Sequence, residues 1–259
     1  MDMGIAGRRA LLTGASRGMG LACATALASE GVEVTIVARN EETLCRAARH
    51  IEVATGTRVA FVAADITSDE GRRKALGACP QPDILLNNAG GFPPGDFRDW
   101  DRNTWIAAID LMMLPPILMI REVFDGMMER GFGRIVNIAS RSVKIAQPEM
   151  GLSNGARSGL VGFMAGIARA GTYRGVTVNT LLPGIFDTDA QRDHVAALAA
   201  ETGRGFDEIW NERAAGNPAR RYGRAEEIAA YFTFLCSVHA GFITGQNLMI
   251  DGGSYPGTY

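Results

Sequence analysis

Short apolar stretches alternate along the chain with longer segments whose apolar residues recur at helical spacing. The stretch 32–38 is rich in β-branched residues, and 84–86 is continuously apolar, as is typical of parallel strands covered on both faces. The repeated strand–helix units predict an α/β fold, a Rossmann-type doubly wound parallel sheet flanked by helices in three layers. The predicted strands are 9–12, 32–38, 59–63, 83–87, 133–138, 176–182 and 247–250, and the predicted helices are 19–29, 41–55 (capped by Asn40), 68–78 (capped by Ser68), 100–111, 117–130, 152–171 and 225–237.

Two features interrupt this alternation. Pro115 and Pro116 predict a kink or break between neighbouring helices. The stretch 187–222 contains the run Ala-Ala-Leu-Ala-Ala, the aromatic residues Phe206 and Trp210, and many charges. Because ligands bind beyond the carboxyl ends of the strands in such sheets, we interpret 187–222 as a substrate lid, with a solvated helical excursion as the alternative. The chain 1–259 is otherwise expected to form a single domain.

Composition and charge exclude several classes of protein. The formal net charge of -2 gives no reason to expect nucleic acid or an anionic membrane as a partner. No apolar run is long enough to span a bilayer, and residues 1–4 do not begin a signal peptide. The four cysteines are scattered and the three histidines lie far apart in sequence, so we expect a cytoplasmic protein without a disulfide framework or a metal site.

The segment 13–20, Thr-Gly-Ala-Ser-Arg-Gly-Met-Gly, lies where the first predicted strand meets the first helix. Gly14 permits a tight turn, Gly18 lets the backbone approach a pyrophosphate, and Gly20 lets the helix pack against the sheet. Free N–H groups and the positive end of the helix dipole then face the phosphates. The segment therefore predicts a dinucleotide site that also includes Ser16, Arg17 and Met19; a plain structural turn is the alternative.

Further motifs follow in order. They are Asn87-Asn88-Ala89-Gly90, Asn137-Ile138-Ala139-Ser140, Pro183-Gly184 with Thr188, and Gly245 with Asp251-Gly252-Gly253. Together with the glycine loop, they resemble the motifs of the classical short-chain dehydrogenase/reductase family, and in particular its 3-oxoacyl-carrier-protein reductase-like branch. The resemblance covers nearly the whole chain and implies an oxidoreductase that acts on a carbonyl/alcohol pair of a small-molecule substrate. It also implies cofactor contacts from Asn88, Ala89, Gly90, Arg157, Pro183, Gly184, Phe186 and Thr188.

The end of the second strand bears on the choice of cofactor. An acidic residue there would accept the ribose 2′-hydroxyl of NAD, whereas a basic residue would accommodate the 2′-phosphate of NADP. This strand leads into Arg39 and Asn40, and Arg17 lies in the glycine loop, so two guanidinium groups could clamp the phosphate. We therefore expect NADP(H) rather than NAD(H). Asp65 and Ile66 match the pair that contacts adenine in the family, although helix-start chemistry is an alternative for them.

The catalytic positions depart from the family's pattern. Members usually place a tyrosine 13 residues after the active-site serine and a lysine four residues further on, but counting from Ser140 reaches Ser153 and Arg157. The resemblance thus implies that YxxxK is replaced by SxxxR. The position of the family's active-site asparagine falls on Met112, or on Asp110 in an alternative alignment.

This departure removes the usual proton donor. Ser153 is shorter than tyrosine and a far weaker acid, while Arg157 stays protonated at ordinary pH and can still bind the nicotinamide ribose. Losing a general acid typically costs about 10²–10⁴ in rate. Water between Ser140 and Ser153, or the side chain of Lys144, Tyr222 or His194, are the candidate donors. An NADP(H)-binding protein without hydride transfer (a sensor or partner subunit) and a non-redox enzyme remain alternative functions.

The resemblance also implies a homotetramer or homodimer, because the family pairs the helices that match 117–130 and 152–171 between subunits. Leu160, Phe163, Met164 and Ile167 recur at helical spacing in the second of these helices. Packing against the chain's own sheet is the alternative for these four residues.

Overall fold

The computed structural model describes residues 1–258, which form a seven-stranded parallel sheet with the order β3-β2-β1-β4-β5-β6-β7. The chain winds outward from β1 to β3, crosses to β4, and then winds outward in the opposite direction to β7. The predicted doubly wound parallel sheet is therefore confirmed, with its topological switch point between β1 and β4. The strands are β1 (Arg9–Thr13), β2 (Glu33–Ala38), β3 (Ala60–Ala63), β4 (Ile84–Asn88), β5 (Gly133–Ile138), β6 (Val176–Pro183) and β7 (Asn247–Ile250).

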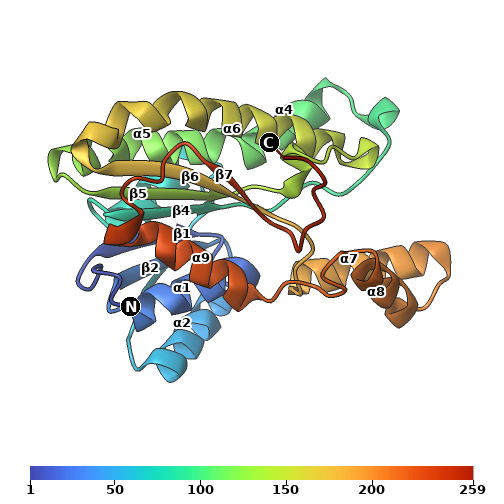
Figure 1. The fold of residues 1–259 in the computed structure, drawn as a ribbon, viewed down its shortest axis with the longest axis horizontal. Coiled ribbons are helices and arrows are strands. Elements are labelled where there is room, and N and C mark those ends of the chain that lie inside the picture. Colours follow the sequence, from blue (N-terminus) through green and yellow to red (C-terminus); the bar gives the residue numbers. More distant parts are fainter. Residues whose placement is uncertain (259) are drawn as a thin grey trace.

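Helices cover both faces of the sheet and complete the predicted three layers (Figure 1). One face carries α1 (Gly18–Ser29), α2 (Glu41–Thr55) and α9 (Ala225–Cys236). The other carries α3 (Asp69–Ala78), α4 (Arg102–Met112), α5 (Leu114–Glu129) and α6 (Gly151–Gly171). Short 3₁₀ helices are η1 (Phe97–Asp99), η2 (Arg141–Val143), η3 (Pro148–Met150), η4 (Thr172–Arg174) and η5 (Val238–Ala240).

Successive side chains of each strand point to opposite faces and so build two separate cores. Leu12 lies in the cluster formed with α1, α2 and α9, while its neighbour Leu11 lies in the cluster formed with α5 and α6. The predicted caps are also confirmed, because Asn40 Oδ1 accepts a hydrogen bond from Thr43 N at 2.9 Å and Ser68 Oγ accepts one from Gly71 N at 3.0 Å. Local sequence thus sets where α2 and α3 begin.

The prediction of a break at Pro115 and Pro116 is wrong in its position. The chain turns at Met113, and both prolines lie in the first turn of α5, which begins at Leu114. Proline is tolerated there because the first backbone N–H groups of a helix have no intrahelical acceptor in any case. The pair therefore starts a helix rather than interrupting one.

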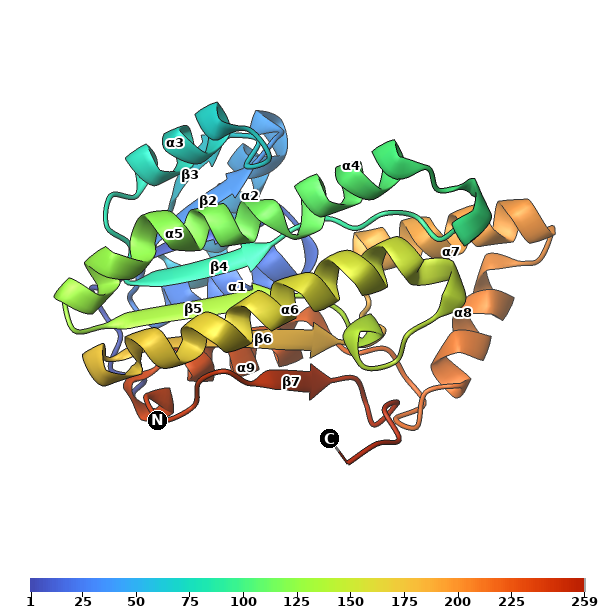
Figure 2. The same ribbon diagram turned by 90° about the horizontal axis from the view of Figure 1, so that it is seen from above.

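The segment predicted as a lid contains two helices, α7 (Asp189–Thr202) and α8 (Phe206–Ala215), which lie beyond the carboxyl ends of the strands (Figures 1 and 2). Three aromatic rings join α8 to the chain that follows it. Phe206 stacks on Trp210 with ring centroids 5.6 Å apart, and Trp210 stacks on Tyr222 at 3.8 Å. This stack ties α8 to the segment that follows it; closure of the segment over a substrate stays a prediction.

Packing separates the four apolar residues of α6 into two groups. Leu160 and Met164 are buried at 2% exposure in the core against the sheet, so they cannot present the subunit interface expected of them. Phe163 and Ile167 are partly exposed at the edge of the same cluster. Within residues 1–258, none of the helices is long and apolar enough to cross a membrane.

Candidate cofactor and active site

A cavity of about 710 Å³ opens at the carboxyl ends of β1, β2 and β4, beside the switch point of the sheet. Most residues predicted to bind a cofactor line it together: Gly14, Ser16, Arg17, Gly18, Met19, Arg39, Asn40, Asp65, Ile66, Asn88, Ala89, Gly90 and Thr188. The sequence interpretation missed further lining residues, among them Thr43, Thr67, Gly91, Leu111 and Ala190. Of these, Thr43 carried a usable signal, because it lies three residues after the N-cap Asn40.

The turn after β1 requires glycine on steric grounds. Gly14 has φ 60°, and a Cβ atom there would lie 2.2 Å from the backbone oxygen of Asn88. A Cβ at Gly20 would lie 2.3 Å from the backbone oxygen of Gly14. The Asn88 side chain closes the turn by donating from Nδ2 to Gly14 O at 2.9 Å. The loop is thus packed so closely against β4 that only glycine fits at positions 14 and 20.

The N-terminus of α1 lacks the capping groups that α2 and α3 have. Its N-cap residue, Arg17, makes no side-chain cap hydrogen bond, and the first turn contains no acidic residue. In α2 and α3, by contrast, a side chain caps the helix and two acidic residues occupy the first turn. Backbone N–H groups and the positive end of the α1 dipole are therefore available to an anion such as a pyrophosphate.

Two cationic side chains border this cavity. Arg39 is exposed at the end of β2, and Arg17 is exposed within the loop, with Nη1 3.8 Å from Asp193 Oδ2 on α7. Thr43 adds a hydroxyl in the first turn of α2, where Oγ1 donates to Asn40 O at 2.9 Å. The set supplies charge and hydrogen bonds suited to a phosphate group on the outer side of the cavity.

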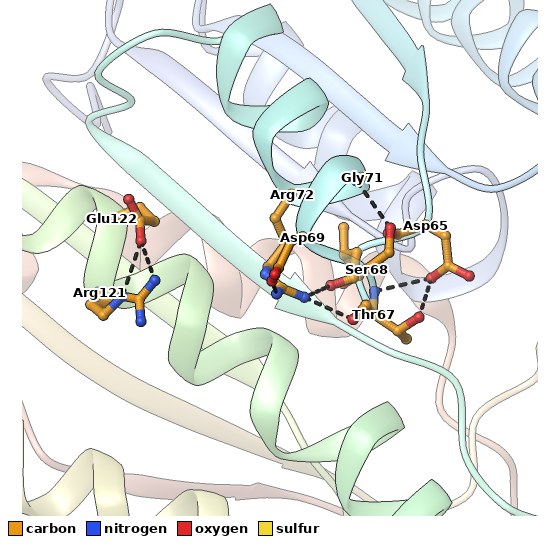
Figure 3. Close-up of polar contacts among 9 residues, drawn as sticks. Asp65, Thr67, Ser68, Asp69, Gly71, Arg72, Arg121 and Glu122 are labelled. Carbon is orange, nitrogen blue, oxygen red and sulfur yellow. Dashed lines mark hydrogen bonds and ion pairs between the residues drawn. The ribbon is translucent and has the colours of Figure 1, made fainter.

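Asp65 serves the turn before α3 as well as lining the cavity. Its Oδ1 accepts hydrogen bonds from Thr67 N at 3.0 Å and Thr67 Oγ1 at 2.8 Å (Figure 3). The Thr67 N–H is the main cause that lowers the pKa of Asp65, and the charge of Arg39 adds a smaller contribution. Arg72 fixes the same turn by donating to Ile66 O and Thr67 O. Asp65 therefore both stabilises the turn that leads into α3 and lines the cavity.

Five predicted cofactor residues lie outside the cavity lining: Gly20, Arg157, Pro183, Gly184 and Phe186. Gly20 supports the loop from behind, as described above. Gly184 packs against Asp251, whose Cα would lie 2.8 Å from an added Cβ. Phe186 is 5% exposed and belongs to the core cluster around α9. Gly184 therefore lies against Asp251 and Phe186 lies in the core, and neither lines the cavity.

Ser140 and Ser153 lie at the end of β5 and in the first turn of α6, and α6 packs against η2. Ser140 Oγ accepts a hydrogen bond from Ser142 N at 3.1 Å, which fixes the side chain as the cap of η2. Its own hydroxyl proton remains available to a ligand. Ser153 is 4% exposed, so its hydroxyl lies inside the protein.

Arg157 is buried in α6 and reaches between the ends of β4 and β5. Its Nη1 donates to Ile138 O at 3.2 Å and its Nη2 to Gly90 O at 3.2 Å, while Nε is buried and has no partner within residues 1–258. Burial lowers the pKa of Arg157 to about 10, which leaves it protonated at pH 7. No carboxylate of the described chain pairs with it, so the site holds an uncompensated positive charge beside Gly90 and Gly91 of the cavity wall.

The chain matches a known protein family along most of its length. The family described as enoyl-(acyl carrier protein) reductase matches residues 14–255. The chain is also 34% identical over 255 residues to an acetoacetyl-CoA reductase of Allochromatium vinosum, covering 96% of this chain and 98% of the relative. The chain belongs to the short-chain dehydrogenase/reductase family. It is thus an oxidoreductase by family.

Two further similarities place this short-chain dehydrogenase/reductase among full-length relatives. A 3-oxoacyl-[acyl-carrier-protein] reductase of Vibrio harveyi is 33% identical over 260 residues, covering 98% of this chain and 99% of the relative. The structure of L-sorbose reductase from Gluconobacter frateurii complexed with NADPH and L-sorbose has a TM-score of 0.93 at 30% identity, covering 99% of this chain and 100% of that chain. The fold is therefore shared along the whole chain.

The remaining candidate donors of this dehydrogenase/reductase lie in different settings. Lys144 Nζ lies 5.4 Å from the ring centroid of Tyr255, and the Tyr222 ring is fixed in the aromatic stack. Burial and the charge of Arg213 lower the pKa of His194, so its imidazole is neutral at pH 7 and is not the imidazolium that an efficient general acid requires. Among residues 1–258, no group of three His, Cys, Asp or Glu side chains could hold a metal ion.

Neither residue aligned with the family's asparagine offers an amide to the site. Met112 is 2% exposed and packs against Leu152 and Ala156, whereas Asp110 is exposed on α4. Apolar packing thus fills one position, and solvent surrounds the other.

Proposed function

We propose that this protein is an NADP(H)-dependent oxidoreductase that interconverts a small carbonyl compound and its alcohol at an atypical active site. The observation that carries the proposal is the uncapped N-terminus of α1 beside Arg17 and Arg39, because this arrangement offers an anion site at the switch point of the sheet. A close structural neighbour, L-sorbose reductase, is complexed with NADPH. An acidic residue suited to NAD is absent from the end of β2, where Ala38 is followed by Arg39 and Asn40.

The residues present fit a dinucleotide phosphate. The glycine loop and the first turn of α1 would hold the pyrophosphate through backbone N–H groups, and Arg39, Arg17 and Thr43 would hold the 2′-phosphate. Asp65 and Ile66 would border the adenine, and Arg157 would bind the nicotinamide ribose. The unpartnered Nε of Arg157 supports this last role, since a buried guanidinium N–H requires an acceptor.

The chemistry follows from the groups around Ser140. NADPH, when bound, supplies a hydride to the carbonyl carbon. The Ser140 hydroxyl donates a hydrogen bond to the carbonyl oxygen, and its orientation is set by the hydrogen bond that Oγ accepts from Ser142 N. The positive charge of Arg157 stabilises the developing alkoxide through the low-dielectric interior. One proton must then reach the alkoxide oxygen to give the alcohol.

We infer that Ser153 and Arg157 stand in the positions of the family's tyrosine and lysine, and that water held between Ser140 and Ser153 delivers the proton. A serine hydroxyl cannot extend as far as a phenol, so a water molecule is required to bridge the remaining gap. Arg157 stays charged at pH 7 and so does not exchange protons with this water. It orients the ribose and supplies a fixed positive field.

The proposal is tested by following NADPH absorbance with a panel of ketones, oxo acids and 3-oxoacyl thioesters. We expect substrate-dependent oxidation of NADPH with at least one class, and the matching alcohol as the product by mass spectrometry. Turnover is expected to be slower than that of family members with the usual tyrosine, because the general acid is weaker. The absence of oxidation across the whole panel, with NADPH bound, would instead indicate a binding protein without hydride transfer.

Replacing Arg39 by alanine is expected to weaken NADPH binding by about 10- to 100-fold while NADH binding changes by less than about twofold. The reason is that only NADPH has the 2′-phosphate that a guanidinium would bind through charge-assisted hydrogen bonds. Isothermal calorimetry with both nucleotides measures the effect. Arg46→Ala is the matched control, because Arg46 lies in the N-terminal half of α2 but does not line the cavity. Its Nη2 lies 3.9 Å from Glu42 Oε1. Equal losses for both nucleotides would assign Arg39 a structural role.

We also propose a cytoplasmic homotetramer or homodimer. Its four cysteines are free, which suits a reducing compartment. On α6, Phe163 and Ile167 are partly exposed, and an added Cβ at Gly162 or Gly166 would meet no atom within 4 Å. This open face would allow close approach of a second α6.

A further inference from the structure

Two half-buried arginines, one directly after Ser140 and one on α8, lie outside the cofactor cavity. Arg141 is the first residue of η2 and directly follows Ser140, and Arg213 lies near the end of α8. Within residues 1–258, the Arg141 guanidinium makes no hydrogen bond or ion pair, and Arg213 Nε is buried without a hydrogen-bond partner. Neither residue lines the cavity at the N-terminus of α1. We call Arg141 and Arg213 the arginine pair.

Three other arginines of the α7–α8 region, by contrast, have carboxylate partners. Arg192 Nε lies 2.7 Å from Asp187 Oδ1, and Arg204 Nη2 lies 2.8 Å from Glu208 Oε1. Arg221 likewise pairs with Glu227 at 2.6 Å. These three exposed arginines are paired within the chain, whereas neither member of the more buried arginine pair forms an ion pair in residues 1–258. Burial without an anion is costly, so the pair calls for a ligand from outside the chain.

The two charges of the pair lie close enough to affect one another. Burial lowers the pKa of Arg141, and the positive charge of Arg213 lowers it further. Asp251 acts in the opposite direction but by less than Arg213, and its oxygens accept hydrogen bonds from backbone groups: Oδ1 from Gly253 N at 3.0 Å and Oδ2 from Tyr255 N at 2.8 Å. Repulsion between two like charges is relieved when an anion lies between them.

The neutral groups around Arg213 can still form hydrogen bonds. Tyr222 Oη is buried and has no hydrogen-bond partner of normal geometry in the described chain, although Arg213 approaches it. Burial raises the pKa of Tyr222 and keeps the phenol neutral, while burial and Arg213 keep the His194 imidazole neutral at pH 7. Asp187, the carboxylate that acts on Tyr222, pairs with Arg192, and Arg213 forms no ion pair within residues 1–258. The aromatic stack of Tyr222 on Trp210 holds this wall in place.

We propose that Arg141 and Arg213 bind a carboxylate or phosphate group of the substrate and thereby place its carbonyl against Ser140. The substrate class is then an oxo acid or a keto phosphate rather than a neutral ketone. Guanidinium groups bind both oxyanions in bidentate geometry, and two of them clamp one group from opposite sides. This inference rests on the proposed oxidoreductase function, but it concerns the substrate end of the site and not the cofactor cavity.

The experiment compares matched acid and ester substrates with the full-length protein and NADPH. We measure kcat/KM for 2-, 3- and 4-oxo acids and for their methyl esters, and for hydroxyacetone phosphate against hydroxyacetone. For the wild-type protein, we expect kcat/KM to be at least about 30-fold higher for one acid than for its ester, or for hydroxyacetone phosphate than for hydroxyacetone. Arg213→Met is expected to reduce that ratio by at least about 30-fold, chiefly through KM, because one of two charged partners is lost. NADPH affinity stays within about twofold.

Arg204→Met is the matched control, because Arg204 precedes the same helix but pairs with Glu208 and Glu212 on the surface. It is expected to leave the acid-to-ester ratio unchanged. A wild-type ratio near one, or equal losses for acid and ester in Arg213→Met, would overturn the inference. If no carbonyl compound is reduced, the oxidoreductase proposal fails, and calorimetry then tests the arginine pair separately. We expect the wild-type protein to bind levulinate more tightly than methyl levulinate. Equal or undetectable binding of the two refutes the inference.

Discussion

Gly14→Ala is expected to lower NADPH affinity by at least about 100-fold. Gly14 has φ 60°, and its added Cβ would lie 2.2 Å from Asn88 O, so the turn has to move away from β4. The movement breaks the hydrogen bond from Asn88 Nδ2 to Gly14 O and displaces the N-terminus of α1, which would hold the pyrophosphate. Calorimetry with NADPH gives the affinity, and chemical denaturation gives the unfolding free energy, which we expect to fall by about 2–4 kcal/mol.

Gly7→Ala separates the steric effect from the backbone effect. Gly7 also has a positive φ, 74°, but an added Cβ there meets no atom within 4 Å. This variant is therefore expected to lose about 1 kcal/mol of stability, as a left-handed non-glycine residue does, while NADPH affinity stays the same. Gly14→Ala with an NADPH affinity within threefold of the wild type would show that the loop does not hold the cofactor.

Ser140→Ala is expected to lower kcat by about 10²–10³-fold, with NADPH affinity unchanged. The reason is that the hydroxyl would be the hydrogen-bond donor to the carbonyl oxygen, and removing one such donor costs about 3–4 kcal/mol of transition-state stabilisation. The loss should be larger here than at a site with a tyrosine, because Ser153 and water cannot replace it. Single-turnover absorbance changes at saturating substrate measure the hydride-transfer step directly.

Ser142→Ala provides the control for this substitution. Ser142 is 2% exposed, belongs to the same 3₁₀ turn, and its Oγ has no hydrogen-bond partner in the described chain. Its backbone N–H, which donates to Ser140 Oγ, remains in the variant. A comparable loss in both variants would assign the effect to the turn and not to the Ser140 hydroxyl.

Much of the fold could be predicted from the sequence because its signals are local. A continuous apolar run such as 84–86 predicts a strand covered on both faces. Asn40 and Ser68 predict the first residues of helices, because their side chains accept hydrogen bonds from backbone N–H groups of the first turn. The prolines at 115 and 116 were misplaced because the same residue type both begins and breaks helices. Which of these applies depends on the turn at Met113, and that turn is set by packing.

The candidate site also contains some residues that the sequence predicts and others that it does not. The glycine loop is a local feature, so its lining residues could be named in advance. Leu111 and Ala190 reach the cavity from α4 and from the start of α7, and the sequence contains no signal of that approach. The absence of a partner for Arg157 or Arg141 is likewise a tertiary property, since it depends on which acidic residues fold nearby.

The buried charge of Arg157 has a consequence for the lifetime of the protein in the cell. Without a carboxylate partner, this charge destabilises the nucleotide-free form, and an anionic dinucleotide would offset the cost. A ligand at a hundred times its Kd adds about 2.7 kcal/mol to the stability of the folded state. Because proteases remove the unfolded fraction, the abundance of this enzyme would follow the total supply of NADP(H), since NADP⁺ carries the same anionic phosphates as NADPH.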